Sequence, residues 1–151
     1  MSTQSIVLFF ASGAFSGYIP LAPGTWGTLA GLPLCYVLSC LTWPLQFMIL
    51  CVFMPIAAWI SGQGEQYLGK KDPGAIVIDE IAGIMITLLL VPFTFINVIA
   101  GFLLFRFFDI LKPYPISKAE TYFHGGTAVL MDDIIAGIFA RILLEVIIQL
   151  I

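Results

Sequence analysis

Apolar runs alternate with polar joints along the chain. Five runs follow the N-terminal segment, at residues 29–41, 45–60, 75–91, 95–111 and 129–151. Backbone that faces lipid must satisfy its own hydrogen bonds, so runs of this apolarity are predicted to be helices. Several runs are shorter than the ~20 residues that a complete membrane span needs, so we expect some helices to be tilted or only partly embedded.

The composition indicates that the solvent is a bilayer. Hydrophobic residues make up 60% of the chain and charged residues only 10%, against roughly 25% charged residues in an average soluble domain. We therefore expect one all-α integral membrane domain over residues 1–151, a bundle of helical hairpins. The N-terminal MSTQSIVLFFASG lacks the basic stretch of a secretory signal, so we expect it in the mature protein, as an interfacial helix or a short first span. A net charge of −3 without a basic run argues against nucleic-acid binding.

The charged residues are predicted to lie on one face of the membrane. If the runs pair as hairpins, three segments share that face. They are the joint at 61–74, the joint between the last two runs, and the motif APGTWGT (residues 22–28). Five of the six cations lie there, so the positive-inside rule makes this face cytoplasmic. Only Arg141 and Glu145 lie deeper, and their i,i+4 spacing predicts an ion pair.

Three acidic clusters at one depth are the strongest chemical signal in the sequence. They contain Asp79, Glu80, Asp109, Asp132 and Asp133. A carboxylate inside an apolar helix needs a partner, a proton or a metal. Converging carboxylates with few cations among them suit Mg²⁺, which takes oxygen ligands and is usually held together with a substrate phosphate. The candidate ligands are Asp79, Glu80, Asp109 and Asp133.

Some of these acids have a structural alternative. Asp132 is the outermost acid of its cluster and could cap the last helix. Asp109 lies three residues after Arg106 on the same helix face, so the two could form a plain buried ion pair. Small residues, Ala82-Gly83 and Ala136-Gly137, follow the first and last clusters and would let two helices approach closely.

Nearby groups are candidates for binding a phosphate monoester. Arg106 and Lys112 could neutralise its charge, and arginine can grip it through two hydrogen bonds. The motif APGTWGT, with Thr25 at its centre, could offer backbone N–H groups from a turn that leads into a helix N-terminus, or could be a simple turn. His124, the only histidine, could donate to phosphate or serve in acid–base chemistry, or could be an ordinary loop residue.

Taken together, these segments resemble the bacterial phosphatidylglycerophosphatase A family. The matching pieces occur in the family's order: PLAPGTWGTLAGLPL (20–34), IVIDEIAG (76–83), FRFFDILKPYPI (105–116) and HGGTAVLMDDIIAG (124–137). The resemblance implies an all-helical, Mg²⁺-dependent integral membrane phosphatase of the bacterial inner membrane. With the hairpin topology, we expect a multi-pass protein whose acidic clusters lie at the cytoplasmic face. Its substrate would be phosphatidylglycerophosphate, hydrolysed to phosphatidylglycerol and phosphate in phospholipid biosynthesis. The family's acidic residues map onto Asp79, Glu80, Asp109, Asp132 and Asp133.

The sequence leaves open two routes for the chemical step and one alternative function. A carboxylate not committed to the metal could activate water, or could attack phosphorus to form an aspartyl-phosphate. A small cation- or proton-coupled transporter would also carry acids within apolar helices. Transporters usually place such acids near the bilayer midplane and between repeated halves, whereas here the acids are predicted at one face and no repeat is visible.

Overall fold

The computed structural model describes residues 2–114, 116 and 126–150, and the regular structure in these residues is helical. The elements are α1 (Thr3–Ala11), the 3-10 turn η1 (Ser16–Tyr18), α2 (Pro23–Ser39), α3 (Trp43–Leu68), α4 (Ile78–Thr87), α5 (Phe95–Leu111) and α7 (Gly126–Leu150). The prediction of an all-α bundle is confirmed for the described part of the chain.

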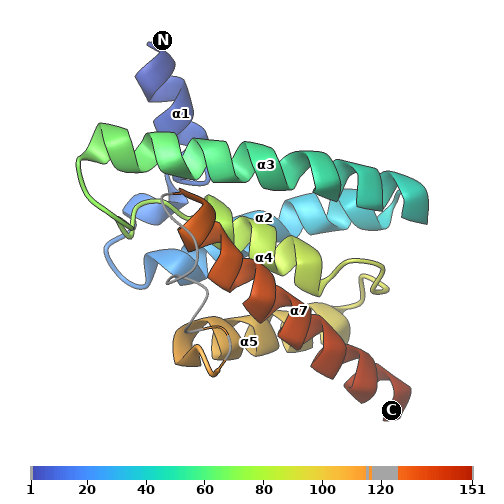
Figure 1. Cartoon of the computed structure of the whole chain (residues 1–151). Helices are drawn as coiled ribbons and strands as arrows, with labels where there is room; N and C mark the ends of the chain where they lie inside the picture. The colour runs from blue at the N-terminus through green and yellow to red at the C-terminus, as the bar shows by residue number, and fades with distance from the viewer. Residues whose placement is uncertain (1, 115, 117–125, 151) are drawn as a thin grey trace.

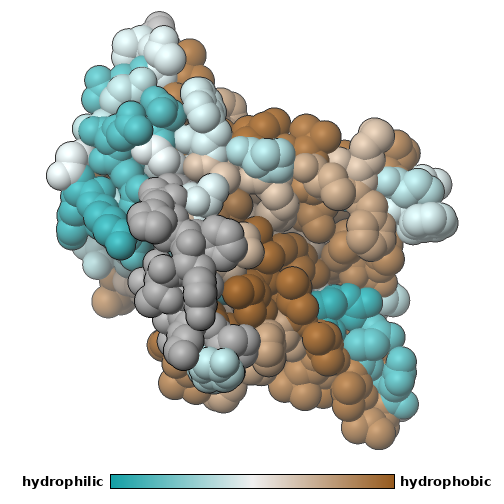
Figure 2. Space-filling view, in the orientation of Figure 1, coloured by the Kyte–Doolittle hydropathy of each residue, from teal (hydrophilic) through white to brown (hydrophobic). Residues whose placement is uncertain are grey.

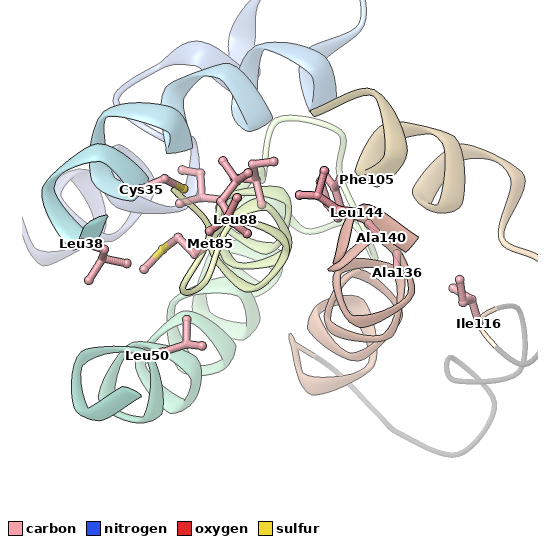
Figure 3. Packing of buried hydrophobic residues seen from close by; sticks show 13 residues of the cluster. Cys35, Leu38, Leu50, Met85, Leu88, Phe105, Ile116, Ala136, Ala140 and Leu144 are labelled. Carbon is pink, nitrogen blue, oxygen red and sulfur yellow. The ribbon is translucent and has the colours of Figure 1, made fainter. Parts of the chain in front are cut away.

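The short helix α4 lies at the centre of the bundle. The longer helices α2, α3, α5 and α7 pack around it (Figure 1), and eight of its ten residues are buried. Figure 3 shows Cys35 and Met85 on the side of α4 that faces α2, and Phe105 with Leu144 on the side that faces α7. Any polar side chain on α4 is therefore held among neighbouring helices.

Several helix boundaries differ from the predicted runs. The motif at residues 22–28 is largely helical, because Pro23 takes the first position of α2, where its missing N–H costs nothing. The predicted joint at 61–74 is wrong in its first half, since α3 continues to Leu68. Gly69, with a φ of 62°, caps the end of this helix. The run at 75–91 contains only ten helical residues. The run at 95–111 is confirmed, and the side chain of Thr94 caps α5 by accepting a hydrogen bond from Asn97 N.

Two hydrogen bonds donated by backbone N–H groups fix the segment that leads into α4. The N–H of Asp72 donates to Glu65 Oε1 of α3 over 2.8 Å. The N–H of Val77 donates to the carbonyl of Ala11 at the end of α1, also over 2.8 Å. The start of α4 is thereby held to both α1 and α3.

Helices α4 and α7 cross at two glycines. A Cβ added to Gly137 would lie 2.6 Å from the carbonyl oxygen of Gly83, and one added to Gly83 would lie 3.0 Å from the carbonyl oxygen of Asp133. The hydroxyl of Thr87 lies 2.9 Å from Gly83 O and 3.3 Å from Gly137 O, so it ties the two helices together. The prediction that small residues let these helices approach closely is confirmed.

The surface divides into a polar end and an apolar belt. The polar end, which contains the α3–α4 loop (residues 69–77) and the starts of α2 and α4, is the mainly teal region at the left of Figure 2. The apolar belt consists of exposed hydrophobic residues on α2, α3, α5 and α7, among them Val37, Trp59, Ile96, Leu103 and Ile142. One of the described helices, α3, is long and apolar enough to cross a membrane.

A polar network ties helices together beyond the belt. Arg141 Nη1 pairs with Glu145 Oε2 at 2.5 Å, as the i,i+4 spacing predicts. The Nε of Arg141 donates to the carbonyl of Leu89 over 2.9 Å, next to the end of α4. Gln46 of α3 accepts a hydrogen bond from the N–H of Leu90 over 3.2 Å. These contacts satisfy backbone groups that the short α4 leaves without helical partners.

Candidate active site

The crossing of α4 and α7 brings two buried aspartates together. Asp79 precedes Gly83 by one turn and Asp133 precedes Gly137 by one turn, so both carboxylates lie on the same side of the crossing. With Glu80 they form what we call the three-acid group. One carboxylate oxygen of each residue lies within 4.8 Å of those of the other two. Asp79 is 5% exposed and Asp133 4%.

The three-acid group has unsatisfied oxygens. Asp79 Oδ1 and Glu80 Oε2 are buried and have no hydrogen-bond partner among the described residues. Such orphaned acceptors cost free energy unless a proton or a cation reaches them. A donor set made only of carboxylate oxygens suits a hard divalent cation such as Mg²⁺. The three residues therefore fit the predicted metal site.

Burial also shifts the protonation of the two acids on α4. This helix is about 15 Å long and does not span a membrane, and both acids lie in its first turn. Burial, followed by the charge of Glu80, raises the pKa of Asp79 well above its usual range. Burial is also the largest cause that raises the pKa of Glu80. A bound cation would favour the charged forms of both.

Helix α5 adds an ion pair beside the three-acid group. Arg106 Nη1 pairs with Asp109 Oδ2, so the predicted i,i+3 pair is present. In addition to burial, the charge of Asp109 raises the pKa of Glu80. The Nε of Arg106 is buried without a hydrogen-bond partner among the described residues. The pair thus leaves one guanidinium N–H available for a further acceptor.

The first turn of α2 closes another side of the site. A Cβ added to Gly24 would lie 2.4 Å from Glu80 Oε1 and 3.0 Å from Arg106 Nη1. Thr25 follows in the same turn and is half-buried, and its N–H donates to the carbonyl of Ala22 over 3.0 Å. The start of the motif APGTWGT therefore lies beside Glu80 and Arg106. Gly24 was missed as a site residue, and its only signal was a glycine within the first turn of a helix.

Asp132 and Lys112 form a second, separate pair. Lys112 Nζ pairs with Asp132 Oδ2, and Asp132 is 4% exposed. Asp132 lies more than one turn inside α7, which begins at Gly126, so the alternative that it caps the helix start is wrong. Lys112 ends α5 in the left-handed region, with a φ of 41°. This pair links the end of α5 to α7, and Asp132 does not belong to the three-acid group.

The predicted phosphate-binding residue His124 lies outside the described residues. The structure brings the other candidates to the starts of α2, α4 and α7 and the end of α5. The roles of Asp79, Glu80, Asp109, Asp133, Arg106, Lys112 and Thr25 in binding and catalysis stay predictions.

Comparison with known proteins decides the family. A protein-family model described as phosphatidylglycerophosphatase A matches residues 9–148. The chain belongs to the phosphatidylglycerophosphatase A family. The family resemblance predicted from the four motifs is confirmed. No solved structure matches the chain.

Curated relatives of the phosphatidylglycerophosphatase A family include two that carry the family name. The phosphatidylglycerophosphatase A of Escherichia coli is 37% identical over 131 residues, which cover 86% of this chain and 76% of the relative. That of Haemophilus influenzae is 38% identical, with 94% of this chain and 88% of the relative covered. A putative phosphatidylinositol-3-phosphatase of Bacteroides thetaiotaomicron is 37% identical over 92% of this chain and 91% of the relative.

Proposed function

We propose that the protein is a Mg²⁺-dependent phosphatase that hydrolyses phosphatidylglycerophosphate to phosphatidylglycerol and inorganic phosphate. The observation that carries the proposal is the three-acid group, with its two orphaned oxygens, beside Arg106. Membership of the phosphatidylglycerophosphatase A family supports the reaction and the lipid.

Asp79, Glu80 and Asp133 would hold the metal, with Asp109 next to them. Mg²⁺ bound there would supply charge to polarise the phosphoryl oxygens and orient the attack on phosphorus. The site has four acids and one close arginine, so a bound cation would be needed to hold the acids in their charged forms while a phosphate dianion approaches.

Arg106 would bind the phosphate that is transferred. Its Nη1 is held by Asp109, which fixes the plane of the guanidinium, and its buried Nε has no partner among the described residues. An arginine fixed in this way can offset charge that develops on the phosphoryl oxygens without reorganising. The half-buried first turn of α2, with Gly24 and Thr25, would line the opposite side of the phosphate.

The chemical step consumes one water. The water oxygen forms a bond to phosphorus, the bond from phosphorus to the glycerol oxygen breaks, and that oxygen takes a proton. A carboxylate that is not a metal ligand would accept the proton of the water, or would first attack phosphorus itself. Asp109 is paired with Arg106 beside Glu80 and is not a member of the three-acid group, which makes it our candidate for this role.

The polar end would lie at the cytoplasmic surface of the bacterial inner membrane, with the apolar belt in lipid. The long apolar helix α3 and the family support membrane association. This orientation puts the three-acid group at the level of lipid headgroups and brings water to a substrate that stays anchored. The three-acid group, Asp109 and Asp132 gather at the starts of α4 and α7 and the end of α5, and this grouping favours the phosphatase over an ion transporter.

The test is phosphate release from phosphatidylglycerophosphate by the detergent-purified protein. We expect release with Mg²⁺ and none with a chelator, and the same protein should show a Mg²⁺-dependent rise in its unfolding temperature. Asp133→Asn should lose both the release, by at least roughly 100-fold, and the temperature rise.

Glu145→Gln is the matched control, because it removes a carboxylate from the exposed ion pair with Arg141 and not from the site. It should retain release and the Mg²⁺ response. Absence of release with every divalent cation tried would sink the enzyme assignment. If phosphate is released faster from phosphatidylinositol 3-phosphate than from phosphatidylglycerophosphate, the substrate is instead the one indicated by the name of the Bacteroides relative.

A further inference from the structure

An apolar cavity opens between α1, α2, α3 and α4, on the side of α4 away from α7. Its volume is about 270 Å³, and all ten residues that line it are apolar or glycine. We call it the α2 groove; its walls include Phe10, Ala14, Ala30, Leu34, Phe53 and Ile81. Phe10 is 53% exposed and Leu34 44%, so the groove opens at the surface of the molecule.

The helices that build the groove also build the active site. Ile78 and Ile81 line the groove and flank Asp79 and Glu80 in the first turn of α4. Along α2, Ala30 follows Gly24 by six residues, which is about 9 Å of helix. The groove therefore starts within two turns of the point where Glu80 and Arg106 meet α2.

We propose that the α2 groove receives an acyl chain of the lipid whose phosphate is hydrolysed. This inference rests on the proposed function. Three observations point to that occupant. The groove offers no polar side chain to a water-soluble ligand. It opens on a surface where apolar side chains are exposed. Its distance from Gly24 along α2 is short enough for one lipid molecule to reach both places.

The groove acts by orienting the lipid. An acyl chain that moves from the bilayer into an apolar groove gains little hydrophobic free energy, since both surroundings are apolar. A chain held in one place does restrict where the glycerol backbone, and hence the phosphate, can lie relative to the acids. Orientation of this kind acts on the rate of the reaction.

The kinetic test fills the groove. Ala30→Trp places a large side chain in it, and Leu34→Trp does the same from a position that is 44% exposed and so tolerates replacement. Each variant should lose roughly tenfold in kcat/KM for long-chain phosphatidylglycerophosphate, as expected when remote contacts that orient the substrate are lost. Leu103→Trp, on the apolar belt of α5 and 59% exposed, should match the unaltered protein.

A photoreactive lipid gives a second, direct test. Phosphatidylglycerophosphate with a diazirine on one acyl chain should label peptides that contain residues 9–14 and 30–34. Phosphatidylcholine with the same chain should label them much less. Equal labelling by the two lipids would mean that the groove is an ordinary lipid-contact surface and would overturn the proposal.

The outcomes separate this proposal from the one on which it rests. If the unaltered protein releases no phosphate, the proposed function fails. If it releases phosphate, and both groove variants are as active as Leu103→Trp, only the acyl-chain assignment fails.

Discussion

At the level of single residues, Gly24 contributes to the site by having no side chain. It lies in the first turn of α2, where Glu80 Oε1 and the guanidinium of Arg106 approach its Cα. A β-carbon there would overlap the flexible end of Glu80 and no backbone atom. A rotation of the Glu80 side chain can relieve that overlap without changing the fold. The same rotation would move the carboxylate of Glu80 out of its place in the three-acid group.

Gly24→Ala is therefore expected to separate activity from stability. Alanine favours the helix over glycine by about 1 kcal/mol, so the unfolding temperature should stay equal or rise. Phosphate release should fall by roughly 100-fold, the order expected when a site group moves by about 1 Å. Measurements of kcat/KM and of thermal unfolding on the same preparation check both parts.

Gly74→Ala is the control for this substitution. A Cβ at Gly74 would meet only Pro23 Cγ at 3.6 Å, an ordinary contact. Its activity should equal that of the unaltered protein. Full activity in Gly24→Ala would contradict the assignment of Glu80 and Arg106 to the site.

The neighbouring aspartates show where reasoning from the sequence stops at this scale. Depth in the membrane predicted that Asp79 and Asp133 would converge. Depth also favoured Asp133 over the outermost Asp132 as a metal ligand. It did not predict the pair of Asp132 with Lys112, because adjacent residues point about 100° apart around a helix and nothing in the sequence sets the rotation of α7. The structure turns Asp133 toward α4 and Asp132 toward Lys112.

At the level of helices, the contact between α4 and α7 sets the distance between the carboxylates. Gly83 and Gly137 let the two backbones touch, and each acid lies one turn before its glycine. A side chain added at Gly137 must push the two helices apart, since the nearest atom it meets is the backbone carbonyl oxygen of Gly83. One added at Gly83 would first meet the ring of Phe105.

Gly137→Val is expected to damage both the fold and the site. Overpacking of this kind typically costs about 1–3 kcal/mol, so the unfolding temperature should fall. The Mg²⁺-dependent rise in that temperature should disappear as well, because Asp133 moves away from Asp79. Ile138→Ala changes the next residue, which is 44% exposed, and should retain the Mg²⁺ response. An unchanged response in Gly137→Val would show that the crossing does not position the acids.

The helix boundaries were predictable where the sequence carries a local signal. The cap at Thr94 and the apolar run after it predict α5. The last two turns of α3 carry polar residues, and this change of pattern predicts a joint. A helix can nevertheless leave an apolar layer and continue into water, so polarity alone does not mark its end. The shortness of α4 was hidden because its apolar run continues through Leu88–Val91, where Leu90 has a φ of 58°. Tertiary contacts from Gln46 and Arg141 set that end.

At the level of the whole molecule, α3 connects two ends of different polarity. Its 26 residues extend over about 39 Å, more than the ~30 Å of a bilayer's hydrocarbon core. Its first residues follow the exposed Thr42, and its last residues reach the polar end beside the exposed Lys70 and Lys71. If α3 crosses the membrane as proposed, these two ends lie in different compartments.

Labelling of single cysteines tests this orientation. In a variant whose Cys35, Cys40 and Cys51 are replaced by alanine, Thr42→Cys should react with a membrane-impermeant maleimide in intact spheroplasts. Lys71→Cys should react only after the membrane is permeabilised, because the positive-inside rule places the lysine-bearing loop in the cytoplasm. Phosphate release by both variants provides the control for folding, since neither residue lies in the site. Reaction of both cysteines from the same side would mean that α3 does not cross the membrane. The reverse pattern would put the three-acid group on the outer face and would contradict the proposed cytoplasmic orientation.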